Sequence, residues 1–147
     1  MPKPVTPMVG CDVFVLNERR EVLLIRRADN GLWAMPGGCQ NLGETPVDCA
    51  ERECFEESGF NVRVSELLGV FSSKQYEYVH YPWKDNEFCH LFFRANLVSG
   101  NPTLSEESTE IGWFSQSNLP ILSDGHEVRV RFAFEKLADP TLAPHFE

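Results

Sequence analysis

The alternation of hydrophobic and polar positions predicts a chain built mainly of strands, with two helices. Runs rich in apolar and β-branched residues, bounded by turn-forming residues, are typical of strands that face a core. Such runs predict strands at 9–16, 21–27, about 61–73, about 87–97 and 111–114. The polar segment 17–20 between the first two runs reads as a hairpin turn.

The first helix is predicted from about residue 46 to residue 58. Thr45 is a favourable N-cap, because its hydroxyl can accept a hydrogen bond from an otherwise unpaired amide of the first turn. Pro46 suits the first helical position, and Gly59 suits the left-handed residue that ends a helix. An apolar stripe is expected to pack this helix on a sheet, and it consists of Val47, Ala50 and Cys54.

The second helix is predicted near the C-terminus. It starts near Ser123 and Asp124 and stops before Pro140, which cannot continue a helix. The residues expected to face inward are Val128, Phe132 and Leu137. Strands interspersed with two helices predict an α+β fold in which helices cover a sheet.

Length and composition predict one domain spanning residues 1–147. The chain has 147 residues, 42% of them hydrophobic, and it shows no internal repeat or linker, so it can bury an ample core. It also lacks a run of about 18 apolar residues that could span a membrane, and an N-terminal run typical of a signal peptide. We therefore expect a soluble, cytoplasmic protein without a membrane partner.

Charge and cysteine content narrow the function classes. The net charge is −9, which argues against a nucleic-acid polymer as the ligand, because such partners are bound through Lys and Arg. A small phosphorylated substrate remains compatible, since a metal ion can supply positive charge locally. The five cysteines are odd in number and form no C-x-x-C pair, so they read as reduced structural thiols.

One face of the first predicted helix is acidic. Glu53, Glu56 and Glu57 are spaced i, i+3 and i+4, so their carboxylates project from one side. Arg52 is the only basic residue on the helix, so few cations balance the repulsion. A solvated acidic face is the plain explanation, but carboxylates arranged in this way behind a glycine pair are also suitable ligands for Mg²⁺ or Mn²⁺.

The segment 38–60 resembles the signature of the Nudix hydrolases. The match comprises, in order and spacing, Gly38, Glu44, Arg52-Glu53, Glu56-Glu57 and Gly59. Cys54 and Phe60 stand where the family usually has aliphatic residues, but both are apolar. The resemblance implies a mixed β-sheet between α-helices. It also implies Mg²⁺-dependent hydrolysis, with Mn²⁺ as an alternative, of a diphosphate linkage in a nucleoside diphosphate derivative.

The acidic helix supplies most of the expected site. The expected metal ligands are Glu53, Glu56, Glu57 and, by resemblance, the carbonyl of Gly38. Glu44 is expected to pair with Arg52 and so to orient the helix from outside the ligand shell. A plain structural ion pair is an equal alternative for Arg52.

The resemblance places the catalytic base either within the helix or on a later loop. The helix candidates are Glu53 and Glu57, and the loop candidates are Glu107 and Glu110, for which plain solvation is the alternative. Arg27 ends the second predicted strand and resembles an arginine that many family members direct at substrate phosphate. Its alternative is a surface charge at the end of a strand.

An aromatic segment between residues 71 and 88 is the expected source of base recognition. Tyr76 and Tyr78 could stack a nucleobase, but the segment could equally be an edge hairpin or a contact in a homodimer. His80 and His90 read as structural or surface residues. By resemblance to family members that cleave dinucleoside polyphosphates, which often carry a tyrosine here, the tyrosines slightly favour such a substrate. ADP-ribose and (d)NTPs stay open as alternatives.

A non-catalytic Nudix module that binds a nucleotide and regulates a partner is the alternative function. Such modules usually lose carboxylates of the signature, whereas this chain keeps them. The intact signature therefore favours an enzyme that acts on a small-molecule nucleotide.

Overall fold

The computed structural model describes residues 6–75 and 87–147, and its centre is a mixed sheet. The strands are β1 (Met8–Leu16), β2 (Val22–Arg27), β3 (Trp33–Ala34), β4 (Gly37–Cys39), β5 (Phe60–Ser72), β6 (Phe88–Gly100) and β7 (Ser108–Phe114). The helices are α1 (Pro46–Ser58) and α2 (His126–Ala138), and 3-10 turns cover Ser73–Gln75 and Gln116–Asn118. No helix in the described residues is long and apolar enough to cross a membrane.

The sheet follows the order β3-β2-β1-β6-β5, with β4 beside β1 and β7 beside β2. β1 and β6 run parallel, whereas the other pairs are antiparallel. Within the described chain, β1 and β2 pair only at Leu16 and Val22, so they diverge after the hairpin and β2 pairs mainly with β7. The edge of β1 that β2 leaves is taken by β4, which sets Gly37 opposite Asp12 and Gly38 opposite Cys11.

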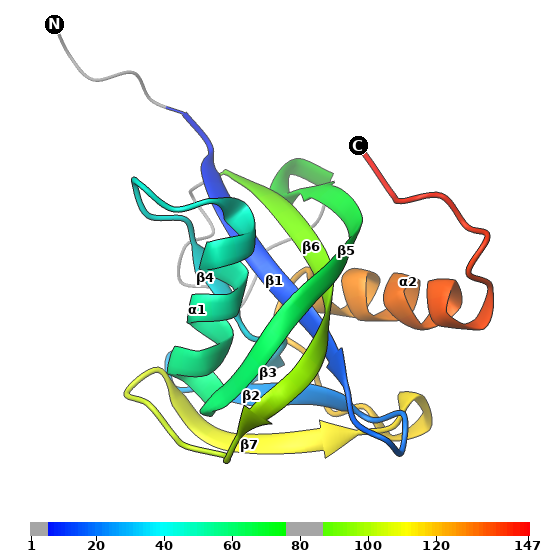
Figure 1. Ribbon diagram of the computed structural model, residues 1–147. Helices are drawn as coiled ribbons and strands as arrows, with labels where there is room; N and C mark the ends of the chain where they lie inside the picture. Colours follow the sequence, from blue (N-terminus) through cyan, green and yellow to red (C-terminus); the bar gives the residue numbers. More distant parts are fainter. Residues whose placement is uncertain (1–5, 76–86) are drawn as a thin grey trace, which may run out of the picture.

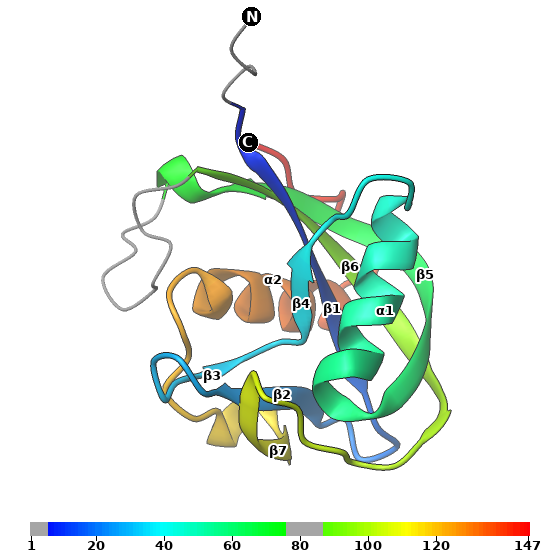
Figure 2. The same ribbon diagram turned by 90° about the vertical axis from the view of Figure 1, so that its left-hand side faces the viewer.

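The two helices cover opposite faces of the sheet (Figures 1 and 2). One face of β1 packs through Val13 and Val15 against Ala50 and Cys54 of α1. The other face packs through Phe14, together with β5 and β6, against α2. The predicted mixed sheet between helices is therefore confirmed, and all five cysteines are free thiols as expected.

For each helix, the prediction of which residues face the sheet was partly wrong. Val47 and Val128, which the pattern points inward, are 37% and 38% exposed. On α1 the buried stripe instead begins at Cys49. On α2 the sheet-facing positions include Arg129 and Val130. An apolar pattern cannot locate that face, because a charged side chain occupies it and finds its counter-charge on β1.

Candidate active site

Two glutamates of α1 share a cavity with the glycines of β4. The helix starts at a capping box, in which the Thr45 hydroxyl accepts from Asp48 N at 3.1 Å and the Asp48 carboxylate accepts from Thr45 N at 3.0 Å. From that start, α1 lies alongside β4 (Figure 2). Glu53 and Glu57 therefore line a cavity of about 590 Å³ with the glycine pair.

Glu57 is a carboxylate held almost without solvent. It is only 5% exposed, and its Oε1 accepts a hydrogen bond from Gly37 N at 2.9 Å. Burial raises the pKa of Glu57 well above its usual range, Glu53 and Glu107 raise it further, and the Gly37 amide and the charge of Arg27 offset part of the rise. Such a site favours a bound cation, which would relieve the cost of the buried negative charge.

Glu53 lies against Gly38, and only a glycine leaves it room. A Cβ on Gly38 would stand 2.5 Å from the Glu53 carboxyl carbon. Arg52 Nη1 donates to Glu53 Oε1 at 2.8 Å, which fixes the orientation of the carboxylate. Burial raises the pKa of Glu53, and the hydrogen bond and charge of Arg52 offset part of that rise.

Arg52 connects the helix to the preceding loop. It forms a two-pronged pair with Glu44, from Nε to Oε2 at 2.9 Å and from Nη2 to Oε1 at 2.7 Å, so the predicted pairing is present. The hydrogen bonds from Arg52 and from Asn41 N lower the pKa of Glu44 to about 2. The same guanidinium reaches Cys39 O at 3.3 Å, which ties α1 to the end of β4.

The three carboxylates expected to bind a metal are not equivalent. Glu53 and Glu57 line the cavity, whereas Glu56 is exposed and accepts from Arg52 Nη1 at 3.1 Å. In the described part of the chain, no three side chains of His, Cys, Asp or Glu converge into a preformed metal site. The donors in the cavity are two carboxylates with the backbone of the glycine pair, and hard oxygen atoms of this kind suit Mg²⁺ or Mn²⁺.

The remaining predicted residues separate into those at the cavity and those away from it. Arg27 lines the cavity and is held by Asp29, whose Oδ1 accepts from its Nε at 2.8 Å. Glu107 also lines the cavity, whereas Glu110 is paired with Arg26 Nη1 at 2.8 Å. Tyr76, Tyr78 and His80 lie outside the described residues.

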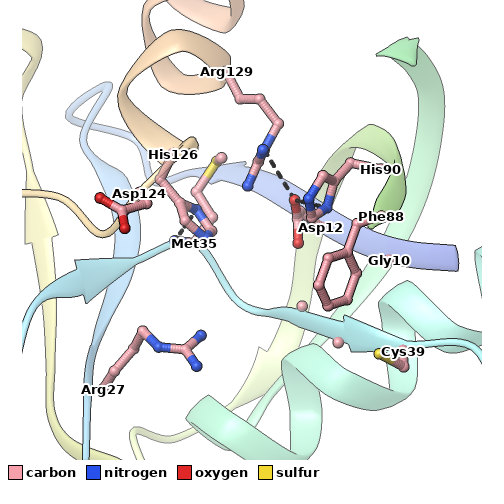
Figure 3. Close-up of a pocket in the computed structure, with 12 residues that line it drawn as sticks. Gly10, Asp12, Arg27, Met35, Cys39, Phe88, His90, Asp124, His126 and Arg129 are labelled. Carbon is pink, nitrogen blue, oxygen red and sulfur yellow. Dashed lines mark hydrogen bonds and ion pairs between the residues drawn. The ribbon is translucent and has the colours of Figure 1, made fainter. Parts of the chain in front are cut away.

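A second group of polar residues, which the sequence reading missed, lies between the sheet and α2 (Figure 3). Asp12 Oδ2 stands 3.0 Å from Arg129 Nε and 3.7 Å from His90 Nδ1. His126 Nδ1 accepts from Met35 N at 3.2 Å. The available signals were Asp12 within the apolar run of β1 and Arg129 among the apolar residues of α2, each a charge at a buried position.

Comparisons with known proteins agree with this architecture. The model of the NUDIX domain matches residues 6–136. A MutT-like protein from Streptomyces ambofaciens is 39% identical over 101 residues, which are 69% of this chain and 59% of that protein. An ADP-ribose pyrophosphatase from Methanocaldococcus jannaschii is 32% identical over 126 residues, which are 82% of this chain and 69% of that protein. Among solved structures, a UDP-X diphosphatase matches with a TM-score of 0.84 at 20% identity, over 99% of this chain and 70% of that one.

The chain therefore belongs to the Nudix family, as the signature resemblance predicted. By class it is a Nudix pyrophosphohydrolase, which acts on phosphoanhydride bonds. The TM-score shows that this chain shares the fold of the solved structure, and at 20% identity the likeness carries no substrate to this chain.

Proposed function

We propose that this chain hydrolyses a diphosphate linkage in a nucleoside diphosphate derivative with Mg²⁺, or Mn²⁺, held by Glu53 and Glu57. The observation that carries the proposal is that these two carboxylates share one cavity with Arg27. A divalent ion would neutralise the carboxylates, and the arginine would meet the substrate phosphate. The Gly38 carbonyl is the proposed further metal ligand. Glu56, which accepts a hydrogen bond from Arg52, is proposed as the metal ligand farthest from the cavity.

Each residue of the cavity has a proposed task. A bound divalent ion supplies phosphate binding and a water of lowered pKa. Arg27, held in place by Asp29, orients the phosphate through its planar guanidinium. Arg52 keeps the Glu53 carboxylate turned toward the cavity. Glu107, which lines the cavity, is the proposed acceptor of a proton from the attacking water, with Glu53 and Glu57 as the alternatives on α1.

The proposed substrates are dinucleoside polyphosphates, ADP-ribose and (d)NTPs. A cavity of about 590 Å³ is of the size usual for small-molecule sites. ADP-ribose is also the substrate in the name of the relative from Methanocaldococcus jannaschii. The tyrosines that favour a dinucleoside polyphosphate lie outside the described residues, so a substrate panel decides among the three classes.

The test separates and identifies the products formed from ADP-ribose, diadenosine polyphosphates, (d)NTPs and nucleotide sugars in Mg²⁺ and in Mn²⁺, where cleavage of a diphosphate linkage gives a nucleotide and a second phosphorylated product. We expect Glu53→Gln and Glu57→Gln to lower turnover about 100-fold or more. Glu51→Gln is the matched control, since Glu51 lies on the same helix but does not line the cavity. Electron paramagnetic resonance of bound Mn²⁺ gives a second readout. Unchanged turnover and unchanged Mn²⁺ affinity in both variants would contradict the proposal.

The loop carboxylates form a matched pair for the assignment of the base. Glu107 lines the cavity, whereas Glu110, three residues later, is paired with Arg26. Glu107→Gln should therefore lower kcat with little change in KM, and Glu110→Gln should leave both near the wild-type values. Equal effects of the two substitutions would move the assignment of the base back to α1.

A further inference from the structure

A smaller inner pocket opens beside the catalytic cavity. It encloses about 40 Å³, and its polar walls are formed by Asp12, His90, His126 and Arg129 (Figure 3). The two spaces share Arg27, Phe88 and the segment 37–39 as lining, so they are adjacent compartments of one site. A ligand that places its phosphates at the acidic face of α1 can therefore extend into the inner pocket.

Arg129 presents hydrogen-bond donors that lack an acceptor. Its side chain is 1% exposed, and its Nη1 has no hydrogen-bond partner among the described residues. Its Nε lies 3.0 Å from Asp12 Oδ2, which is a close ion pair without hydrogen-bond geometry. Leaving a buried charged donor unpaired is costly, so the pocket is suited to an acceptor from outside the chain.

The charges around the pocket nearly balance. Asp12 and Asp124 oppose Arg27 and Arg129. Burial and the charge of Arg129 lower the pKa of His90 to about 4, although Asp12 raises it, and they lower the pKa of His126 well below its usual range, so both rings are neutral near pH 7. A phosphate would bring net negative charge next to Asp12, whereas a neutral polar group would not. The pocket therefore fits a neutral ligand group.

From these observations, and resting on the proposed function, we infer that the inner pocket binds the lactam edge of a nucleobase. Arg129 donates to the carbonyl oxygen, and Asp12 accepts from the neighbouring ring N–H. Guanine, hypoxanthine and uracil carry this pair of groups. Adenine and cytosine carry an amino group in place of the carbonyl, which would set donors against the donors of Arg129.

The size of the pocket agrees with entry of an edge. One water molecule needs about 10–15 Å³ of cavity volume. The inner pocket of about 40 Å³ therefore accommodates a carbonyl group and the neighbouring ring N–H, but not a whole ring. The ring itself would lie at the mouth, beside Phe88, which lines both compartments and stacks on His90 with ring centroids 5.4 Å apart. Arg129 is thus assigned as a residue that determines base specificity.

The test is calorimetric titration of the full chain with GDP, IDP and ADP in EDTA, which removes the metal needed for hydrolysis. We expect GDP and IDP to bind about tenfold or more tightly than ADP, since a hydrogen bond to a charged group is the difference. Arg129→Lys keeps the positive charge but lacks the forked guanidinium, so it should weaken GDP binding to the level of ADP while leaving ADP binding unchanged. Arg131→Lys is the matched control, because Arg131 lies exposed on the same helix, paired with Glu127.

The possible results separate this inference from the proposed function. Equal binding of GDP and ADP would mean that no base edge enters the pocket, and a preference that survives Arg129→Lys would mean that the Arg129 guanidinium does not select the base. Either result would overturn the inference. If Arg129→Lys fails to fold, comparison of UDP with CDP on the wild-type chain decides, with a tenfold preference for UDP expected and equal affinity overturning it. Absence of cleavage of every substrate in the panel with Mg²⁺ and with Mn²⁺ would instead count against the proposed function, while the contrast between GDP and ADP in EDTA still judges the inference.

Discussion

At the scale of single residues, Glu57 shows a conflict between stability and the proposed chemistry. Its carboxylate is buried and its pKa is raised by that burial, so ionisation at neutral pH costs free energy when no cation is bound. Its Oε1 nevertheless accepts from Gly37 N, a bond that a glutamine can keep. Replacement of the charge alone should thus help the fold while it harms the site.

We predict that Glu57→Gln raises the Tm of the metal-free chain while it lowers turnover. At this chain length a gain of 1 kcal/mol corresponds to about 2–4 °C. Scanning calorimetry in EDTA at pH 8 measures the shift, and Glu51→Gln should leave Tm within about 1 °C, as expected of a partly exposed position. A lower Tm for Glu57→Gln would show that the carboxylate stabilises the fold without a cation.

At the scale of elements, α1 is positioned by the link between its middle and the loop before it. Arg52 binds Glu44 through two hydrogen bonds and Glu53 through a third, so one guanidinium aligns both the loop and a proposed metal ligand. Because the pKa of Glu44 is about 2, this link stays ionised across the neutral and mildly acidic range. Loss of the link should act through Glu53 and leave the core of the sheet intact.

We predict that Arg52→Lys lowers turnover and Mn²⁺ affinity about 10- to 100-fold, because a lysine cannot reproduce the two-pronged pair. Glu44→Gln should have a similar effect, and the double variant should be little worse than either single one, since both remove the same link. Turnover and Mn²⁺ affinity are measured for the wild type, the two single variants and the double variant, which together form a double-mutant cycle. Additive losses would show that the two residues act independently.

The elements also show what the sequence could predict. The bounds of α1 follow from local chemistry, namely the Thr45 cap and Gly59, and they agree with the structure. β3 and β4 contain two and three residues, too few for any periodic signal, and their places depend on pairing with distant strands. The inner pocket is even harder to predict from the sequence, because it forms only when β1, β6 and α2 bring Asp12, His90 and Arg129 together.

The candidate site likewise has features that the sequence predicts and features that only the packing of α1 decides. The carboxylates of α1 are separated by fixed helical steps, so their grouping could be read from the sequence. Which of them faces the cavity depends on how α1 packs, and the structure turns Glu53 and Glu57 inward while Glu56 stays exposed. The same holds for Glu107, which lines the cavity, and Glu110, which is paired with Arg26.

At the scale of the whole molecule, the joined compartments hold buried groups whose ionisation affects stability in opposite directions. At the acidic end, Glu53 and Glu57 have raised pKa values in the fold, so they contribute stability as the pH falls. At the inner end, His90 and His126 have lowered pKa values, because burial and the positive charge of Arg129 disfavour the protonated rings. As the pH is lowered, these histidines take up protons in the unfolded chain at a higher pH than in the fold. Their contribution to stability is therefore lost as the pH falls.

The histidine contribution can be isolated by difference. The pKa of His90 falls from about 6.5 in an unfolded chain to about 4 in the fold, so acidification across that window removes about 3 kcal/mol through this group alone. We predict that the free energy of unfolding, measured in urea at constant ionic strength, falls less steeply between pH 6.5 and pH 4 for His90→Gln and His126→Asn than for the wild type. The amide side chain introduced by His126→Asn would retain an acceptor for Met35 N, so the fold of that variant should persist. The carboxylates are common to all three proteins and cancel in the difference. Parallel pH profiles for the wild type and both variants would mean that the rings bind protons in the fold as readily as in the unfolded chain, which would contradict the lowered pKa values of His90 and His126.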